Sequence, residues 1–545
     1  MRFNHRVLIS GLLACAFVLP ACVFAHDDPT DKPKAEKFGR VYFKTSCTPE
    51  AQKQFERALA MLHSFFFPET VKAFTEIPET DPSCAIAYWG IAISQRPNPL
   101  VGPFAAATLK RGLDAIDKGE AIGAKTAQER DWLAALKEFY KDYDKVDQDV
   151  RTQNYAGAME ALVRKYPKDV EAKIFYALAL NETFDHKSMA PLNKAIAILE
   201  PIDKKYPDHP GVTHYLIHSY DFAPIAKKGV PYADKYSKIA PSAPHAVHMP
   251  SHIYSMVGMW EPSIRSNIGS AELAHAFVTK NFPGAVYHAE LHAHDFMQYA
   301  YLQLGQDSKA KELAGEAAAM IKAKPKMVGV ALAGYTAMAA IPARYALERQ
   351  NWQEAAALEP PGGNFPQADA ITYFARSLGA AHTGNFTAAQ QDIDKLKEQR
   401  AALEKNNQSY WAGQVEVQIL GAQAWLAQGQ GNKDEALKFM RAAADLEDGS
   451  EKHVAMENRL YPMRELLADM LMAQGQPALA LTEYEKSIPN APARLRGLYG
   501  AAKAAEATGD KKKAAAYFRS LSRLTAKGDG NRPELREARQ HLASR

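Results

Sequence analysis

Apolar side chains recur three and four positions apart through most of the chain, with Glu, Lys and Gln between them. This spacing places apolar residues on one face of an α-helix. The alternation of apolar and polar residues that is typical of a half-buried strand is nearly absent. The segments 466–474 and 500–508 show the helical pattern clearly, and each ends at a glycine. The pattern therefore predicts an all-α protein whose helices are joined by short turns.

The C-terminal helices repeat with a step of 34 residues. Three pairs of positions lie 34 residues apart: Gly475 and Gly509, Ala480 and Ala514, and Tyr484 and Phe518. A small alanine lets two helices approach closely, and the aromatic residue fills the gap to the next hairpin. A single hairpin cannot bury its apolar face alone, so such repeats must stack. This step resembles the tetratricopeptide repeat (TPR). It predicts a TPR-like helical-hairpin solenoid wound as a right-handed superhelix, with a generic helical bundle as the alternative.

A cluster of prolines and glycines at 360–366 is the strongest break in this pattern. We expect a joint between two solenoid segments there. The predicted organisation is a signal peptide at 1–25, an N-terminal extension at 26–50, a first TPR-like segment with a His-rich groove at 51–358, and a C-terminal TPR segment at 367–545.

The N-terminus is typical of an export signal. Arg2 and Arg6 precede an apolar run at 7–19, and small residues lead up to Ala25. The run is shorter than the ~20 residues of a membrane-spanning helix, and no later stretch is long and apolar enough to span. We expect cleavage after Ala25 and export to the bacterial periplasm. The alternative is an outer-membrane lipoprotein, because the residues ending at Cys22 resemble a lipobox.

The net charge and the cysteines bear on the kind of partner and on a possible disulfide. Lys and Arg total 66 against 62 Asp and Glu, a formal charge of +4, which argues against a nucleic-acid partner. The chain has four cysteines and no Cys-x-x-Cys motif. Cleavage after Ala25 would leave only Cys47 and Cys84. In an oxidising compartment these two could form a structural disulfide around the first helical hairpin.

Histidines gather in the middle of the chain, where ten of the 17 lie between His209 and His294. Three pairs are spaced four residues apart, which places both rings on one helix face. The first two pairs are 34 residues apart and the third follows after 40, so equivalent positions on successive helices are expected. An aspartate follows the first and third pairs by three residues. The pairs and aspartates are His214/His218, His248/His252, His288/His292, Asp221 and Asp295.

Imidazole with an occasional carboxylate is a ligand set for Zn, Cu, Fe or Ni rather than Mg or Ca. Methionine sulfur can bind copper, and several methionines lie nearby in the sequence. The expected metal is therefore Zn or Cu. The predicted ligands are His214, His218, His248, His252, His292, Asp295 and Asp221, with His245 and His288 as secondary candidates. The alternative is that these histidines are satisfied within the repeat or line a wet groove.

Recognised catalytic motifs are missing. The segment 288–292 spaces two histidines as in His-Glu-x-x-His, but its acid, Glu290, is in the wrong place. There is no Gly-x-Ser-x-Gly elbow, Walker A loop or dinucleotide-binding glycine motif. Catalysis would have to use the His/Asp cluster, with Glu290 or Asp221 as general base on metal-bound water.

Several strings resemble a family of exported bacterial TPR proteins of unassigned activity. They are Thr45-Ser46-Cys47, Leu62-His63-Ser64-Phe65, Asp81-Pro82-Ser83-Cys84-Ala85, the segment 209–218 and the segment 245–254. The resemblance implies the solenoid fold and an exported location. It marks His214, His218, His245, His248, His252, His292 and Asp295 as motif positions, whereas His288 and His294 lie outside the matching strings.

Together these features predict an exported TPR-repeat binding protein whose His-rich groove holds a transition metal, an anionic peptide or a small ligand. The alternatives are a metal-dependent hydrolase and an interaction scaffold in which the histidines only shape the groove. A protein or peptide partner is expected, with no nucleic acid and no transmembrane segment.

Overall fold

A computed structural model of the chain describes residues 36–457, 459–529 and 532–543. From Lys37 onward the chain forms one compact unit. The predicted signal peptide and Cys22 lie outside the described residues. No helix within these ranges is long and apolar enough to cross a membrane.

Between residues 49 and 256 the regular elements are α-helices and a single 3-10 turn. These elements are α1 Pro49–His63, α2 Phe67–Thr80, α3 Ala87–Ser94, α4 Ala106–Ile122, α5 Ala127–Tyr140, α6 Gln148–Lys165, α7 Val170–Glu182, α8 Ala190–Lys205, α9 Pro210–Tyr220, η1 Ala226–Gly229, α10 Val230–Ile239, α11 Pro244–His248 and α12 Pro250–Met256.

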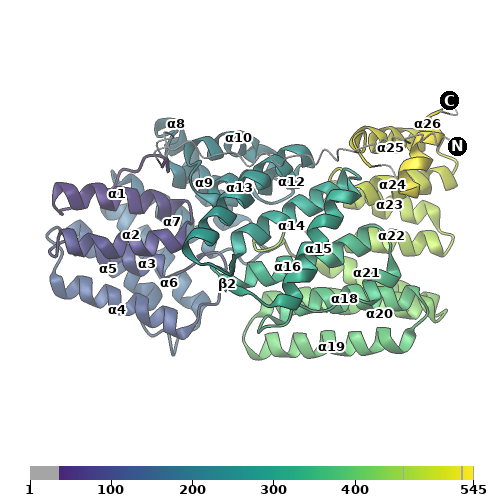
Figure 1. The fold of residues 1–545 in the computed structure, drawn as a ribbon, viewed down its shortest axis with the longest axis horizontal. Coiled ribbons are helices and arrows are strands. Elements are labelled where there is room, and N and C mark those ends of the chain that lie inside the picture. The colour runs from purple at the N-terminus through teal and green to yellow at the C-terminus, as the bar shows by residue number, and fades with distance from the viewer. Residues whose placement is uncertain (1–35, 458, 530–531, 544–545) are drawn as a thin grey trace, which may run out of the picture. The chain divides into compact units, whose positions relative to one another are not determined.

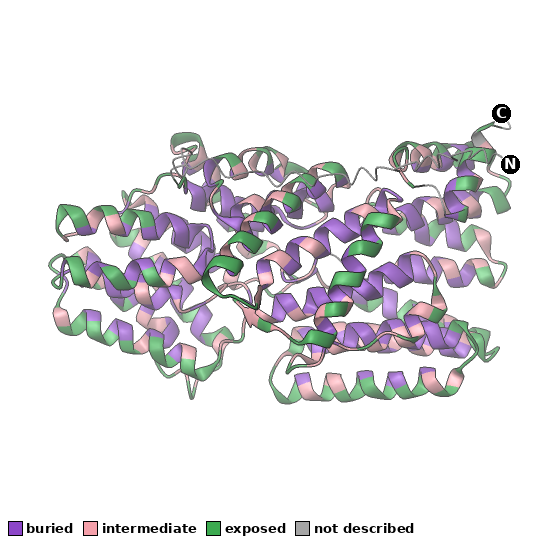
Figure 2. Cartoon of the chain, in the orientation of Figure 1, coloured by how far each residue is buried: buried purple, intermediate pink, exposed green. Residues whose placement is uncertain are grey.

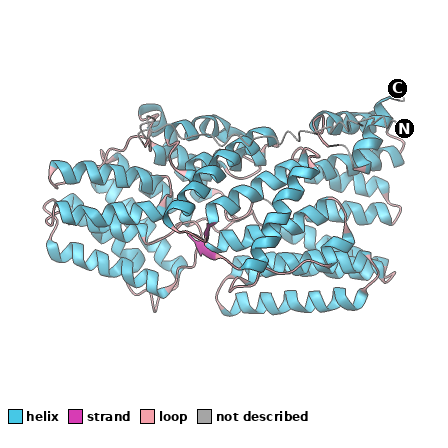
Figure 3. Ribbon diagram, in the orientation of Figure 1, coloured by secondary structure: helices cyan, strands magenta, loops and turns pink. Residues whose placement is uncertain are grey.

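The remainder adds more helices and one pair of three-residue strands, which are parallel (Figure 3). The elements are α13 Trp260–Asn281, β1 Ala285–Tyr287, α14 His288–Gln303, α15 Asp307–Ala323, β2 Lys326–Val328, α16 Ala331–Glu348, α17 Trp352–Ala356, α18 Pro366–His382, α19 Phe386–Lys405, α20 Ser409–Gly429, α21 Lys433–Asp448, α22 Met463–Ala473, α23 Pro477–Ser487, α24 Leu495–Ala507, α25 Lys511–Leu524 and α26 Pro533–Ala543.

Consecutive helices pack against each other as hairpins, for example α1 with α2, α5 with α6, α18 with α19 and α20 with α21 (Figure 1). The predicted all-α class built from helical hairpins is therefore confirmed. Figure 2 shows that the buried residues of each helix face its neighbours, while the outer face of α19 is largely exposed.

The 34-residue step corresponds to the hairpins α22/α23 and α24/α25. Its alanines and aromatic residues are all buried: Ala480, Ala514, Tyr484 and Phe518. Gly475 and Gly509 form the two turns with φ of 74° and 81°. A Cβ at either position would meet no atom within 4 Å. The glycines are therefore needed for this left-handed backbone conformation, which ends each first helix.

Two large hydrophobic cores lie along the unit. The first is built mainly from α1 to α12, and the second from α16 to α25. The proline- and glycine-rich segment at 360–366 lies in the loop between α17 and α18, and both of these helices contribute to the second core. The domain boundary expected there stays a prediction.

Residues 37–48, before α1, form no helix or strand, and Gly39 lies against Pro210 of α9 and Ile239 of α10. The backbone amides of Lys37 and Arg40 donate to Ser242 and Asp208. Cys47 and Cys84 form a disulfide that ties this segment to the turn before α3. The pair expected from the cysteine count is thus joined in the structure.

The C-terminal hairpins return to the middle of the chain. The indole of Trp260 on α13 donates to the carbonyl of Ala493 at 2.8 Å, and Arg532 pairs with Asp307 at 2.6 Å. These contacts hold α13 to α15 beside α24 to α26. The loop 449–462 between α21 and α22 then reaches the first half, where Lys452 meets Asp221.

A candidate metal centre

Six of the clustered histidines come together in two groups of three from α9, α11, α12 and α14. We call His214, His218 and His245 the outer trio, and His248, His252 and His292 the inner trio. Within each trio the ligand nitrogens lie within 4.8 Å of one another. The two trios are neighbours, since the rings of His218 and His252 are 6.1 Å apart between centroids.

Pro250 sets the geometry of the inner trio. It lacks a backbone N–H, so the helical ladder is interrupted between α11 and α12. Met249 keeps a helical conformation at the junction (φ −52°, ψ −35°). His248 and His252 consequently remain on one side of the chain, with their Nε2 atoms 3.0 Å apart.

Hydrogen bonds fix the outer nitrogen of both rings. Nδ1 of His248 donates to Oδ1 of Asn267 at 2.6 Å. The orientation of that amide follows from its other contact, because its Nδ2 donates to the carbonyl of Ser263. Nδ1 of His252 donates to Oδ2 of Asp221 at 2.7 Å. Each neutral ring carries a single N–H, so both Nε2 atoms present lone pairs to each other.

Two facing lone pairs at 3.0 Å repel unless a cation lies between them. For nitrogen ligands about 2.0–2.1 Å from a tetrahedral ion, the distance between two ligands is about 3.3 Å. The separation of the two Nε2 atoms is close to this value. Donation of the outer N–H to a carboxylate or carbonyl is also the usual arrangement behind a metal-binding histidine. The third ring, His292, has an Nδ1 that is buried and lacks a partner in the described chain.

The outer trio is built in a related way. Nδ1 of His214 donates to the backbone carbonyl of His63 at 2.6 Å, and its Nε2 lies 3.1 Å from Nε2 of His245. This pair can share one proton, with His245 as donor. His218 completes the trio, and neither of its ring nitrogens has a hydrogen-bond partner among residues 36–457, 459–529 and 532–543.

The surroundings keep the rings neutral. Phe296 packs against all three inner rings at centroid distances of 4.7 to 5.1 Å. Burial lowers the pKa of every ring in the two trios, to about 4 for His248. The neutral ring is the form that binds metal ions.

Asp221 acts behind the inner trio rather than within it. The same Oδ2 that accepts from His252 also accepts from Nζ of Lys452 at 2.8 Å. Burial raises the pKa of Asp221, and the ammonium of Lys452 opposes that shift. The carboxylate therefore fixes the tautomer of His252 and compensates the buried lysine.

The other predicted ligands lie elsewhere. Asp295 is buried in an ion pair with Arg344. His288 contacts the carbonyl of Val328 at 3.4 Å and belongs to neither trio. The third sequence pair is thus divided, since His292 joins the inner trio and His288 does not. His245, a secondary candidate, is a full member of the outer trio.

A nearby group, His63, Glu171 and His209, has the composition of a metal site but is satisfied by hydrogen bonds. Glu171 accepts from Nε2 of both histidines at 3.0 Å and from the backbone amide of Tyr42 at 2.7 Å. The remaining ring nitrogens are also used, by Tyr215 and by the amides that start α9. Despite burial, the charges and hydrogen bonds of the two histidines hold the pKa of Glu171 well below its usual range.

Of the groups that orient the rings, the sequence pattern singled out Asp221 but not Asn267, Lys452 or the carbonyl of His63. Asn267 lies one helix away from His248, and Lys452 is 231 positions from Asp221. The carbonyl of His63 that orients His214 is a backbone atom. No spacing rule connects such distant positions. The only sequence signal was that Lys452 lies in a long loop between two regular helices, where functional residues are often found.

No family model and no curated protein matches the chain. Two solved structures are similar to it at low level. The first, "Structure of Naa15/Naa10 bound to HypK-THB", is 12% identical over 91% of both chains, with a TM-score of 0.24. The second is a tetratricopeptide repeat protein from Parabacteroides merdae, 13% identical over 75% of this chain and 99% of the other, with a TM-score of 0.24.

Proposed function

We propose that the protein binds a transition-metal ion, Zn or Cu, at the inner trio, and that the outer trio forms a second position beside it. One observation carries this proposal. Nε2 of His248 and of His252 face each other at 3.0 Å while both Nδ1 atoms donate to other acceptors. A shared cation accounts for this arrangement. The group around Glu171 is the contrasting case, because hydrogen bonds to other groups engage all the ring nitrogens of His63 and His209.

Hydrolysis has less support than binding. The two candidate bases already have other partners, because Asp221 accepts from His252 and Lys452 while Glu290 accepts from His275 at 3.0 Å.

An exported location remains part of the proposal. It is supported by the N-terminal sequence and by the Cys47–Cys84 disulfide, since disulfides persist in oxidising compartments. The protein or peptide partner stays a prediction.

The test is metal analysis of the full chain, purified without a polyhistidine tag and stripped with a chelator. Zn²⁺ and Cu²⁺ are added separately, and bound metal and unfolding temperature are measured. We expect at least one tightly bound ion per chain. At a free concentration 100-fold above Kd, binding should stabilise the fold by about 2.7 kcal/mol.

His252→Ala removes an inner ligand and should abolish the tight site. His275→Ala is the matched control, because this imidazole lies in the same region but its side chain is 67% exposed and outside both trios. If neither metal binds the wild-type chain, or if His252→Ala binds as the control does, the proposed metal centre is wrong.

A further inference from the structure

A pocket of about 510 Å³ lies beside the outer trio. Residues of α6 and α7 and the loops that follow α3 and α7 form one side of it, and the start of α20 and the loop 449–462 form the other. His218 contributes to its lining. The ring of His218 is 3% exposed, and both nitrogens lack a partner in the described chain. A member of the outer trio, with two unpartnered nitrogens, therefore lies at the edge of this pocket.

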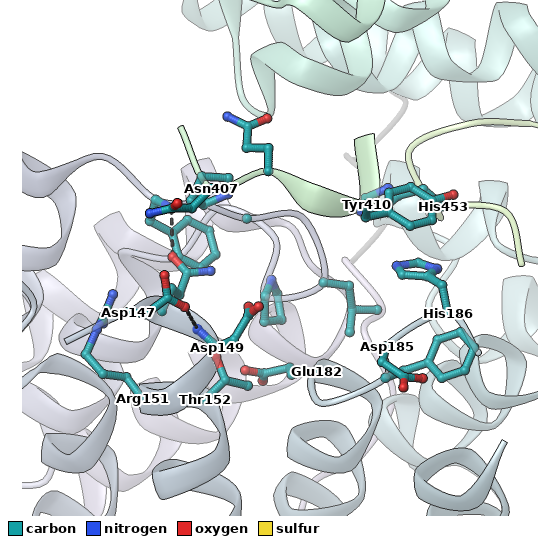
Figure 4. Close-up of a pocket in the computed structure, with 18 of the residues that line it drawn as sticks. Asp147, Asp149, Arg151, Thr152, Glu182, Asp185, His186, Asn407, Tyr410 and His453 are labelled. Atoms are coloured by element: carbon teal, nitrogen blue, oxygen red, sulfur yellow. Dashed lines mark hydrogen bonds between the residues drawn. The ribbon is translucent and has the colours of Figure 1, made fainter. Parts of the chain in front are cut away.

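The described lining of the pocket carries more negative than positive charge. Asp147 and Asp149 lie at one end together with the only arginine of the described lining, Arg151, and Asp185 lies at the other end beside His186 (Figure 4). That arginine donates to the backbone carbonyls of Val146 and Phe139 instead of to a carboxylate. The charge of Arg151 still offsets that of Asp147 in part, so net negative charge is left to act on the pocket. A concave surface with one sign of charge concentrates ions of the opposite sign.

Imidazoles lie at the other end of the pocket, beside Asp185. Figure 4 shows His186 there, facing Tyr410 and His453. The ring of His186 lies 4.1 Å from Tyr410 and 5.4 Å from His453 between centroids. Nδ1 of His186 is buried and has no partner within the described residues. The pocket thus combines carboxylates, a buried imidazole nitrogen and His218 of the outer trio.

We propose that this pocket is the route by which a hydrated divalent transition-metal cation reaches the two trios. This inference rests on the proposed metal centre. The aspartates attract the hydrated cation, and the imidazoles replace its water ligands one at a time. Nitrogen ligands bind Zn²⁺ and Cu²⁺ more strongly than carboxylates do. A cation that meets the carboxylates first and the imidazoles afterwards is therefore bound more strongly as it moves toward the trios.

The test is the rate of Zn²⁺ uptake by the apo full chain, followed by stopped flow with a zinc indicator dye. The triple variant D147N/D149N/D185N removes the charge but keeps the local fold. Asn retains the oxygen with which Asp147 caps α6 and with which Asp185 accepts two backbone amides. D114N/D394N/D510N is the control, because it removes the same charge from sites that do not line the pocket.

At an ionic strength of ~0.01 M we expect the association rate of the triple variant to fall about tenfold, while the number of Zn²⁺ ions bound at equilibrium is unchanged. The wild-type rate should fall as salt is added, and the rate of the triple variant should change much less. The control variant should match the wild type.

Equal rates for the two triple variants would overturn the proposed route and indicate entry elsewhere, for example past the half-buried ring of His245. That result would leave the metal centre intact. A wild-type chain that takes up no Zn²⁺ or Cu²⁺ would instead reject the metal centre itself.

Discussion

The substitution Asp221→Asn tests whether the carboxylate behind His252 tunes the proposed metal centre. Oδ2 of Asp221 accepts from Nδ1 of His252 at 2.7 Å and from Nζ of Lys452 at 2.8 Å. Asparagine keeps an oxygen acceptor at this position but removes the negative charge. His252 should stay oriented, while its Nε2 becomes a weaker donor to a metal ion.

Loss of such a partner typically reduces metal affinity 10- to 100-fold. This corresponds to about 1.4–2.8 kcal/mol of binding free energy. The substitution has a second effect, because it leaves the ammonium of Lys452 buried without its counter-charge. Breaking a buried pair in this way costs about 3–5 kcal/mol of folding stability. The loss of metal affinity must therefore be measured separately from the loss of folding stability.

The double variant Asp221→Asn/Lys452→Met removes both charges and should recover much of the lost stability. Its Zn²⁺ affinity, measured by calorimetry against a competing chelator, should remain 10- to 100-fold below that of the wild type. Lys452→Met alone keeps the contact between Asp221 and His252, so it should bind Zn²⁺ at least as tightly as the wild type. A folded double variant with wild-type affinity would refute the role given to Asp221.

Three further predictions concern the fold. Replacing Cys47 and Cys84 with serine should lower the free energy of unfolding by about 4 kcal/mol, given a sequence separation of 37 residues, and urea titration would reveal it. Arg494→Met should destabilise by about 3–5 kcal/mol, because it leaves two buried glutamates unpaired; an unchanged unfolding midpoint would contradict this. Burial lowers the pKa of His186 and of His382 to about 4, below the value of 6.5 expected in the unfolded chain. The unfolded state therefore binds more protons, so their contribution is complete above pH 6.5 and is lost as the pH falls toward 4, up to about 3 kcal/mol each. Unfolding midpoints of the chelator-treated protein should decrease across this range.

Local pattern was sufficient for much of the fold. The spacing of apolar residues predicted helices, and the 34-residue step predicted the hairpins α22/α23 and α24/α25. These features depend on which residues lie on one helix face and on turns such as Gly475, which needs a positive φ. Both are properties of a few neighbouring residues, so a single sequence contains them. The pairing of His248 with His252 followed from the same local rule.

The membership of each trio could not be predicted in this way. Spacing grouped His288 with His292, whereas the structure joins His292 to His248 and His252 and brings His245 to His214. The four-residue spacing fixes which rings share a face, but the approach of rings from different helices depends on how those helices pack. That packing places α14 beside α11 and α12, and so brings His292 to His248 and His252.

The sequence by itself determined the helical hairpins and the stretch of chain from which metal ligands could come. Only the tertiary structure decided which nitrogens meet and what holds them. It placed Asn267 behind His248, and it brought Asp221 and Lys452, 231 residues apart, together behind His252. The physical reason is that these hydrogen bonds depend on how α13 packs beside α11 and on where the loop 449–462 meets the first half of the chain, which no local pattern encodes.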